Sequence, residues 1–346
     1  MARRRITTAI LSTAVVASTL AFSAQSTVSA AVSDNDWLGI VNTYRTQSGL
    51  GAITENPAWS SGTKNHSCWM LLNGIAHDEA PGTPGYTASG DESGNSSNVA
   101  VSSNSAATIR SHIDLWMSGP FHAIGILRPS LRQSSFGLCT NPPNQTNTPW
   151  RSAATLDVVR GNDWSAGKSS VPILFPGNGA TTSLTRFIAE SPDPRSFCGW
   201  EAQKVGLPLI AMMPADVTSA SASLNGPNGP VPTCVLHRAN TNGIASALLG
   251  GDNTIVVLPN APLVTGTYSV AVTSNGGNVN WSFKVDPNAP LQTTPPPPLP
   301  STSALAADMP FQPVTPFRFA DSRGNLSVSR LPANKQVRLK MAGQRG

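Results

Sequence analysis

The sequence predicts a multidomain protein: an α/β domain first, then an all-β sandwich, then an incomplete β-rich segment. Two observations support this prediction. In the first half, apolar residues recur at helical spacing, and these runs are interleaved with a few strand-like ones. After Trp164 the chain changes to short β-rich runs separated by Gly, Asn and Pro. Interleaved helices and strands indicate an α-β-α sandwich, whereas serial short strands indicate two packed sheets.

Three helices are expected early in the chain, with a short fourth after them. Residues 37–45 place apolar side chains at positions i, i+3, i+4 and i+7 of one helix face. The second helix covers 56–74, with an Asn-Pro pair at its start and a glycine at its end. The third covers 109–117 and is stopped by a Gly-Pro pair, after which the short helix begins.

The same domain, which we place at residues 31–166, needs strands to complete a sheet. Two are expected, at 136–139 and 154–159. Between the second and third helices, residues 81–104 are rich in Gly, Ser, Asn and Pro. That composition predicts a long loop over a cleft.

The second domain is expected at 167–286, as an immunoglobulin-like or fibronectin-like sandwich. Its last two runs alternate apolar and polar residues, as strands with one buried face do. It shows no catalytic constellation, and the lone His237 is interpreted as incidental. The expected strands lie at 171–175, 207–210, 254–258, 268–272 and 280–285.

The two ends of the chain are assigned by composition. Residues 1–30 combine three arginines, an uncharged run and a Val-Ser-Ala cleavage signal, which predicts a secretory signal peptide. A membrane anchor is the alternative, but Ser and Thr interrupt the apolar run too often for a stable span. Residues 287–309 predict a Pro-rich linker. Residues 310–346, which resemble the opening of a β-rich module of actinobacterial secreted proteins, are too few for a core of their own.

Charge excludes one class of partner. The chain has 23 Lys and Arg against 18 Asp and Glu, but three of the basic residues belong to the signal peptide and seven to the last 37 residues. The body between residues 31 and 309 keeps 13 basic residues against 17 acids. Because binding to a phosphate backbone needs a basic face, we expect no nucleic-acid partner.

Four cysteines in an exported chain predict two disulfides, for which three pairings exist. The simplest pairing stays within each domain, Cys68 with Cys139 and Cys198 with Cys234. No two cysteines form a C-x-x-C motif, so a redox or zinc-thiolate site is not expected.

Two histidine-bearing segments are the most informative part of the sequence. His77 and His122 each follow a predicted helix end, where rigid structure places an imidazole within reach of a cleft. A helix, a second helix before a histidine, and a Trp-Met helix with Pro-Phe-His follow one another in this order. This order resembles the CAP superfamily of cysteine-rich secretory proteins, antigen 5 and pathogenesis-related proteins, in its bacterial secreted branch. The resemblance covers residues 33–163 and implies the α-β-α fold of that family.

The resemblance also implies a cleft lined, in much of the family, by two histidines and two glutamates. His77 and His122 match the histidine positions. The glutamates do not carry over, because Ser97 and Asn98 fall in the family's Gly-Glu-Asn motif and Gly119 stands where a glutamate follows Trp-x-Ser. We expect both histidines with Ser97 and Asn98 in the cleft. Zinc or another divalent cation is expected to bind weakly to the two histidines, with a carboxylate near them from Asp78, Glu79, Glu92 or Asp114. The alternative is that the imidazoles only cap helices or bond within the loop network.

Four further side chains of these helices are interpreted as structural or solvent-facing, and not as part of the site. His66 lies inside the second helix among aromatic residues, which indicates a packed and hydrogen-bonded histidine. Trp116 and Met117 are expected in the core. His112 precedes an apolar residue of the third helix and is expected to face solvent.

The predicted function is extracellular binding, in a protein that is secreted or associated with the cell wall. Reported ligands of the family include lipids, sterols and glycans, and no single activity follows from the fold. The alternative is a secreted hydrolase or peptidase that uses His77 and His122. An ordered carboxylate or serine within hydrogen-bond reach of either histidine would favour the enzyme, whereas two imidazoles between apolar walls would favour binding. The sequence contains no G-x-S-x-G, P-loop or H-E-x-x-H motif.

Overall fold

The structure is a computed structural model that describes residues 31–143, 145 and 148–291. The predicted signal peptide, most of the predicted Pro-rich linker and the segment 310–346 lie outside the described residues. Within the described part, no helix is both long and apolar enough to cross a membrane.

Most of the helices and strands predicted for the first domain are present at the predicted positions. Asp36 caps the first helix by accepting a hydrogen bond from the Gly39 N–H at 2.9 Å, and Gly74, at a φ of 104°, ends the second. The elements are α1 (Trp37–Gln47), β1 (Thr54–Glu55), η1 (Pro57–Trp59), α2 (Ser60–Asn73), α3 (Ala88–Asn95), β2 (Ser97–Ser102), α4 (Ile109–Ser118), α5 (Pro120–Ile126), β3 (Gln133–Ser134), β4 (Phe136–Thr140) and β5 (Ser152–Asp157).

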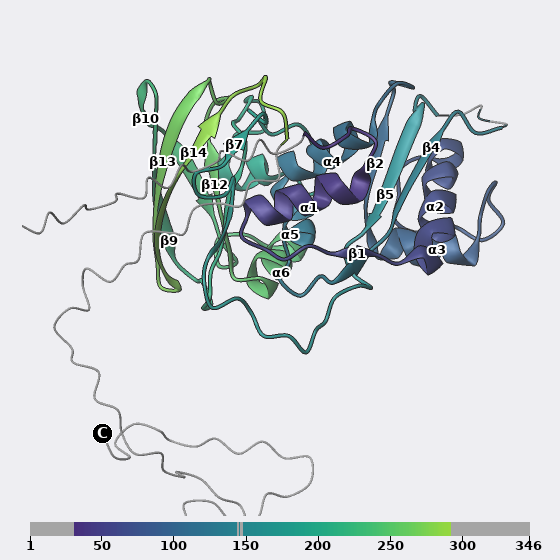
Figure 1. Cartoon of the computed structure of the whole chain (residues 1–346), viewed down its shortest axis with the longest axis horizontal. Helices are drawn as coiled ribbons and strands as arrows, with labels where there is room; N and C mark the ends of the chain where they lie inside the picture. The colour runs from purple at the N-terminus through teal and green to yellow at the C-terminus, as the bar shows by residue number, and fades with distance from the viewer. Residues whose placement is uncertain (1–30, 144, 146–147, 292–346) are drawn as a thin grey trace, which may run out of the picture. The chain divides into compact units, whose positions relative to one another are not determined.

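These elements build an α-β-α sandwich around an antiparallel sheet of order β2-β5-β4 (Figure 1). Helices α2 and α3 cover one face of the sheet, and α1, α4 and α5 lie on the other side. Every residue of β5 is buried, as a central strand with both faces covered requires. The α/β class predicted for this domain is therefore observed.

The predicted loop at 81–104 is wrong in its middle, because the segment contains α3 and β2. A glycine of α2 lets α3 pack closely against that helix. A Cβ at Gly62 of α2 would lie 2.4 Å from the Ser93 Oγ of α3, so a larger residue there would separate the two helices. Thr87 caps α3 through the Gly90 N–H at 2.9 Å.

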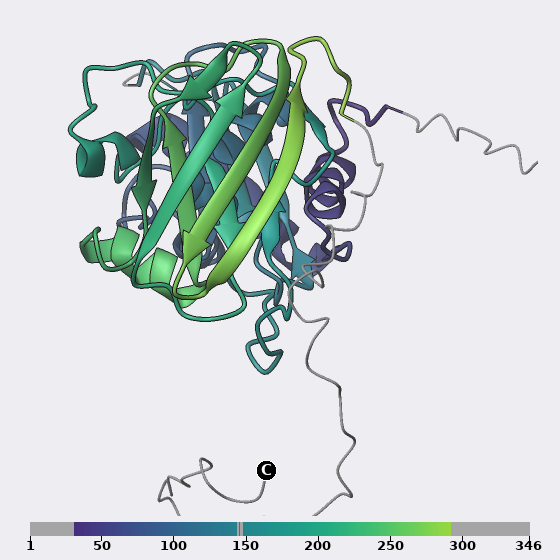
Figure 2. The same ribbon diagram turned by 90° about the vertical axis from the view of Figure 1, so that its left-hand side faces the viewer.

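The second part of the chain is rich in strands, which form a five-stranded sheet of order β10-β9-β13-β14-β7 and a four-stranded sheet of order β11-β12-β8-β6 (Figure 2). The α-helix α6 (Gly243–Gly251) and the 3-10 helix η2 (Pro194–Cys198) interrupt the expected all-β pattern. The immunoglobulin-like topology remains a prediction. The elements are β6 (Ile173–Phe175), β7 (Thr181–Thr182), η2 (Pro194–Cys198), β8 (Leu209–Met212), β9 (Ala220–Gly226), β10 (Gly229–Val231), β11 (Thr233–Leu236), α6, β12 (Thr254–Pro259), β13 (Gly266–Ser274) and β14 (Gly277–Val285).

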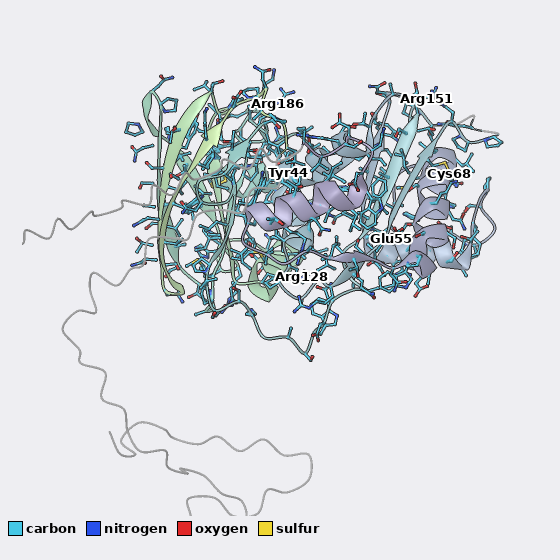
Figure 3. The ribbon with its side chains drawn as sticks, viewed as in Figure 1. Tyr44, Glu55, Cys68, Arg128, Arg151 and Arg186 are labelled. Atoms are coloured by element: carbon cyan, nitrogen blue, oxygen red, sulfur yellow. A yellow bond between two sulfur atoms is a disulfide. The ribbon has the colours of Figure 1, made fainter. Side chains whose placement is uncertain are left out.

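Most of the buried apolar residues of the two parts belong to one continuous cluster that crosses the expected domain boundary, and two smaller clusters are separate from it. Tyr44 of α1 packs edge-to-face on Phe175 of β6, with ring centroids 5.9 Å apart. Arg128 makes an ion pair with Asp252, at 2.9 Å between Nη2 and Oδ2. Figure 3 labels Tyr44 and Arg128 among the side chains of this region. The domain boundary at residues 166–167 remains a prediction, and side chains from both sides of it pack in the same core.

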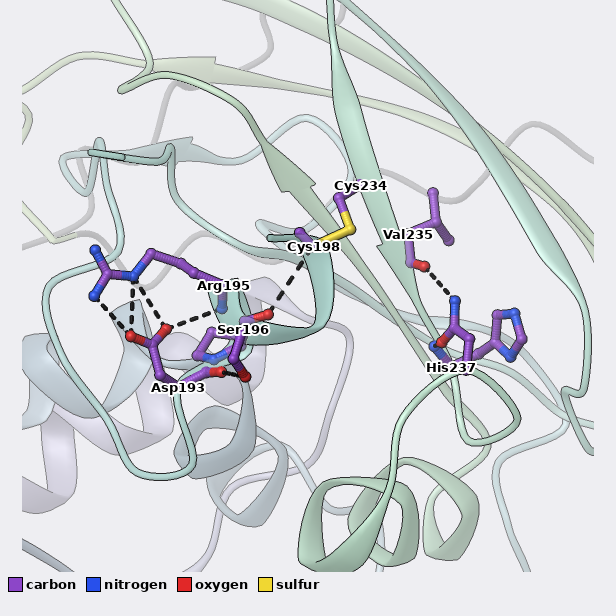
Figure 4. The surroundings of a disulfide bond; sticks show 9 residues. Asp193, Arg195, Ser196, Cys198, Cys234, Val235 and His237 are labelled. Carbon is purple, nitrogen blue, oxygen red and sulfur yellow. Dashed lines mark hydrogen bonds and ion pairs between the residues drawn. A yellow bond between two sulfur atoms is a disulfide. The ribbon is translucent and has the colours of Figure 1, made fainter. Parts of the chain in front are cut away.

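Both predicted disulfides are confirmed. Cys68 of α2 is bonded to Cys139 of β4, and Cys198 of η2 is bonded to Cys234 of β11. Figure 4 shows the second bond beside the Asp193–Arg195 ion pair. Because η2 begins four residues after Glu190, this disulfide holds the segment that carries the Glu190 carboxylate.

Candidate functional site

His77 and His122 line one pocket of about 600 Å³. His77 lies after the end of α2, and His122 lies in the first turn of α5. The pocket is also lined by Glu190 and Ser191 from the second part of the chain. The structure therefore brings the two predicted histidines to the same pocket. It adds a third titratable group, Glu190, which was not predicted from the sequence.

Glu190 holds the imidazole of His122. The Glu190 Oε2 lies 2.8 Å from the Nδ1 of His122 and also accepts the backbone N–H groups of Phe121 and His122, at 3.1 and 3.2 Å. The carboxylate side chain has no exposed surface. Burial raises the pKa of Glu190, and the hydrogen bonds from His122 oppose that rise.

His77 is held by the backbone instead. Its Nδ1 lies 2.9 Å from the carbonyl oxygen of Gly94 at the end of α3. Since a carbonyl can only accept, the Nδ1 of His77 carries the proton and the Nε2 keeps a lone pair. A neutral imidazole held this way can accept a hydrogen bond or ligate a cation through Nε2.

A buried pair braces the segment that carries His77. The Nδ1 of His66 lies 3.0 Å from Glu79 Oε1, and its Nε2 lies 3.0 Å from the carbonyl oxygen of Ala76. The two side chains are completely buried, and the His66 ring stacks on Trp69. Both bonds reach residues that flank His77, so the predicted structural role of His66 agrees with the geometry.

The walls of the pocket are largely apolar. Trp116, one of its lining residues, is 1% exposed and donates its indole N–H to the Val99 carbonyl, so it belongs to both core and pocket. Ile75 contributes an apolar side chain that is 51% exposed. The apolar lining residues are Ile75, Ala76, Val99, Ala100, Val101, Leu115, Trp116, Trp150 and Ala189.

Ser97 and Asn98 do not line the pocket as expected. Both are buried at the start of β2, which is paired with β5. The Asn98 side-chain amide donates to the carbonyl oxygen of His122 at 3.0 Å and so fixes the backbone there. The Ser97 Oγ is buried without a hydrogen-bond partner among the described residues.

The residues present fit a tight zinc site poorly. Across the described ranges, no group of three or more His, Cys, Asp and Glu side chains is placed to hold a metal ion. The Glu190 Oε2 is already occupied by N–H donors. Two imidazole Nε2 atoms could hold a divalent cation only with water or ligand oxygens completing the shell.

His112 is not exposed, contrary to expectation. It is 2% exposed, and its Nε2 lies 2.8 Å from the buried Ser152 Oγ of β5. Burial lowers the pKa of His112 to about 4. The interpretation failed because α4 has the sheet on one side, so a position next to the apolar stripe is also covered.

The comparisons with known proteins identify the class of the first domain. Residues 38–151 match the family described as CAP: Cysteine-rich secretory protein family. This part of the chain is a CAP domain, as the order of its motifs predicts. No curated protein matches the chain.

Among solved structures, the chain is similar to PcoC, a copper resistance protein from Escherichia coli, in its selenomethionine form. The identity is 15%, the match covers 33% of this chain and 95% of that one, and the TM-score is 0.20. A second PcoC structure, described as a methionine rich copper resistance protein from the same organism, covers 35% of this chain and 100% of that one at 15% identity and a TM-score of 0.21. Scores this low carry no argument about the present chain.

Proposed function

We propose that this protein is an extracellular binding protein whose CAP cleft takes a ligand with an apolar body and one polar end. The observation that carries the proposal is the pocket itself: about 600 Å³, apolar walls and three convergent polar groups, His77, His122 and Glu190. Small-molecule sites usually have this size and this division between apolar lining and a few placed polar groups. Two disulfides suit an oxidising compartment outside the cell.

Filling the pocket tests this proposal. Ala189 lines the pocket and is exposed, so Ala189→Trp should occupy the pocket without disturbing the core. Bound long-chain fatty acid, sterol and oligosaccharide can be measured by tryptophan fluorescence, since Trp116 and Trp150 line the site. The variant should lose binding of the probe that the wild type takes. Ala261→Trp, at an exposed position outside the pocket, is the matched control and should bind as the wild type does.

Weak binding of a divalent cation by His77 and His122 is part of the same proposal. Both Nδ1 atoms are tied to oxygens, which is how ligating histidines are usually oriented. Calorimetric titration with zinc should show weak binding at neutral pH that is reduced in His77→Ala and in His122→Ala. Equal binding by all three proteins would make both histidines structural.

The hydrolase alternative gains one specific observation. An ordered carboxylate stands 2.8 Å from His122, which is the feature expected of an enzyme that uses this histidine as a general base. Among the described residues, however, no hydroxyl group hydrogen-bonds to His77 or His122. Turnover of a p-nitrophenyl ester or a peptide that disappears in both His122→Ala and Glu190→Gln would favour the enzyme over the binding protein.

A further inference from the structure

We propose that Glu190, which lies outside the CAP domain, is a positioning residue of the CAP cleft that holds His122 with its Nε2 lone pair toward the pocket. The value of this role for ligand binding rests on the proposed function, but the orientation of His122 by Glu190 can be tested without any ligand. It makes the cleft a composite of two parts of the chain.

Helix α5 begins without a cap of its own. Gly119 occupies the N-cap position, where a side-chain oxygen normally accepts the N–H groups of the second or third helical residue. Glycine has no such oxygen. The Glu190 Oε2 instead accepts the N–H groups of Phe121 and His122, the second and third residues of the helix, and so caps it from a distant segment.

Gly119 leaves the space that the Glu190 carboxylate occupies. A Cβ at position 119 would lie 2.6 Å from the Glu190 Oε2 and 2.9 Å from its Cδ, closer than real Cβ contacts allow. The Gly119 backbone, at φ −108° and ψ 120°, is ordinary extended backbone that any residue adopts. Glycine is therefore needed here for the room it gives to Glu190, and not for its conformational freedom.

Glu190 also sets the tautomer of the neutral His122 imidazole. A carboxylate that already accepts two backbone N–H groups is held as an acceptor, because ionised Glu has no proton to give. The imidazole then donates from Nδ1 to Glu190, and Nε2 carries the lone pair. His77 reaches the same state through the Gly94 carbonyl, so both histidines of the pocket present an acceptor nitrogen.

Glu190 comes from a distant and covalently fixed segment of the chain. Its segment is fixed downstream by η2, which begins at Pro194, and by the Cys198–Cys234 disulfide. Position 190 lies 68 residues after His122 and 39 beyond the last residue of the family match. The CAP domain alone therefore lacks the group that orients one of its two cleft histidines.

Nitrogen NMR of the full chain tests the inference directly. Long-range ¹H–¹⁵N spectra distinguish the two neutral tautomers of imidazole, and they should be recorded at about pH 8, above the ordinary histidine pKa of about 6.5. In the wild type, His122 should show protonated Nδ1 and unprotonated Nε2. Glu190→Ala should give a mixture of tautomers, whereas Glu190→Gln, which keeps an acceptor oxygen, should retain the wild-type tautomer.

A variant with a new cap on α5 distinguishes the effect of Glu190 on the His122 imidazole from its effect on the stability of the helix. Gly119→Asp combined with Glu190→Ala supplies a local cap, so it should recover thermal stability lost in Glu190→Ala but leave His122 in mixed tautomers. Zinc, used as a probe of the histidine pair, should bind about tenfold more weakly to Glu190→Ala, the low end of the effect usual for such supporting groups. Glu201→Ala, an exposed glutamate of the same region, is the control and should match the wild type.

Two results would overturn the inference: a wild-type His122 protonated on Nε2, or an unchanged tautomer in Glu190→Ala. The wild type could also show the expected His122 tautomer and yet bind neither zinc nor any apolar probe. That result would contradict the proposed binding function but support the positioning role of Glu190. The two failures are therefore distinguishable.

Discussion

At the scale of single residues, the sequence reveals the chemistry of a side chain but not its surroundings. His77 and His122 could be chosen because each follows a helix end with a recognisable breaker, a local signal. Glu190 carried no such signal, because its partner is 68 residues away and its neighbours in sequence form no motif. The one hint was Gly119, where the CAP resemblance implies a carboxylate and the chain has none.

His112 supports a prediction about acid stability. Its pKa is lowered by burial from 6.5 to about 4, so the unfolded chain binds more protons than the folded chain between those values. Stability should therefore rise with pH across that window. Acidification from about pH 6.5 to about 4 should cost about 3 kcal/mol through this residue alone.

The variant His112→Gln isolates that contribution, since glutamine does not titrate and can still reach the Ser152 hydroxyl. Urea unfolding at both pH values should show a smaller loss of unfolding free energy on acidification in the variant than in the wild type. Equal losses would mean that His112 does not titrate as its burial implies.

At the scale of elements, the helices with clear caps and breakers were predictable and the close-packed ones were not. Asn56, Gly74 and the Gly-Pro pair after α4 mark helix ends by local chemistry. Helix α3 contains two glycines and only eight residues, so its own propensity is poor. It forms because α2 packs against it, and such a tertiary contact leaves no local signal in the sequence.

A glycine of α3 gives the element-scale prediction. A Cβ at Gly94 would lie 2.2 Å from the His77 carbonyl oxygen and 2.3 Å from the Cε1 of His66, both in rigid surroundings. Gly94→Ala should destabilise the protein by about 1–3 kcal/mol and displace His77. Gly251→Ala, where a Cβ meets nothing within 4 Å, is the matched control and should be neutral or stabilising. Thermal unfolding and the His77 NMR signals report both effects.

At the scale of the whole described chain, the change of pattern near Trp164 correctly indicated a change from α/β to β-rich architecture. It did not indicate that the two parts share a core, because a composition shift reports local structure and carries no information about docking. Tyr44 on Phe175 and Glu190 on His122 are such docking contacts. The shared core holds the two sides of the composite cleft together.

A shared core predicts cooperative unfolding. Phe283 is 1% exposed, lies on β14 and stacks on Tyr268, far along the chain from the CAP domain. Phe283→Ala should lower stability by about 3–5 kcal/mol. If the core is one cooperative unit, hydrogen exchange in β5 of the CAP sheet and in β13 of the five-stranded sheet should accelerate together, and calorimetry should show one transition. In a molecule with two independent cores, the same change would accelerate exchange in β13 and leave β5 protected as in the wild type.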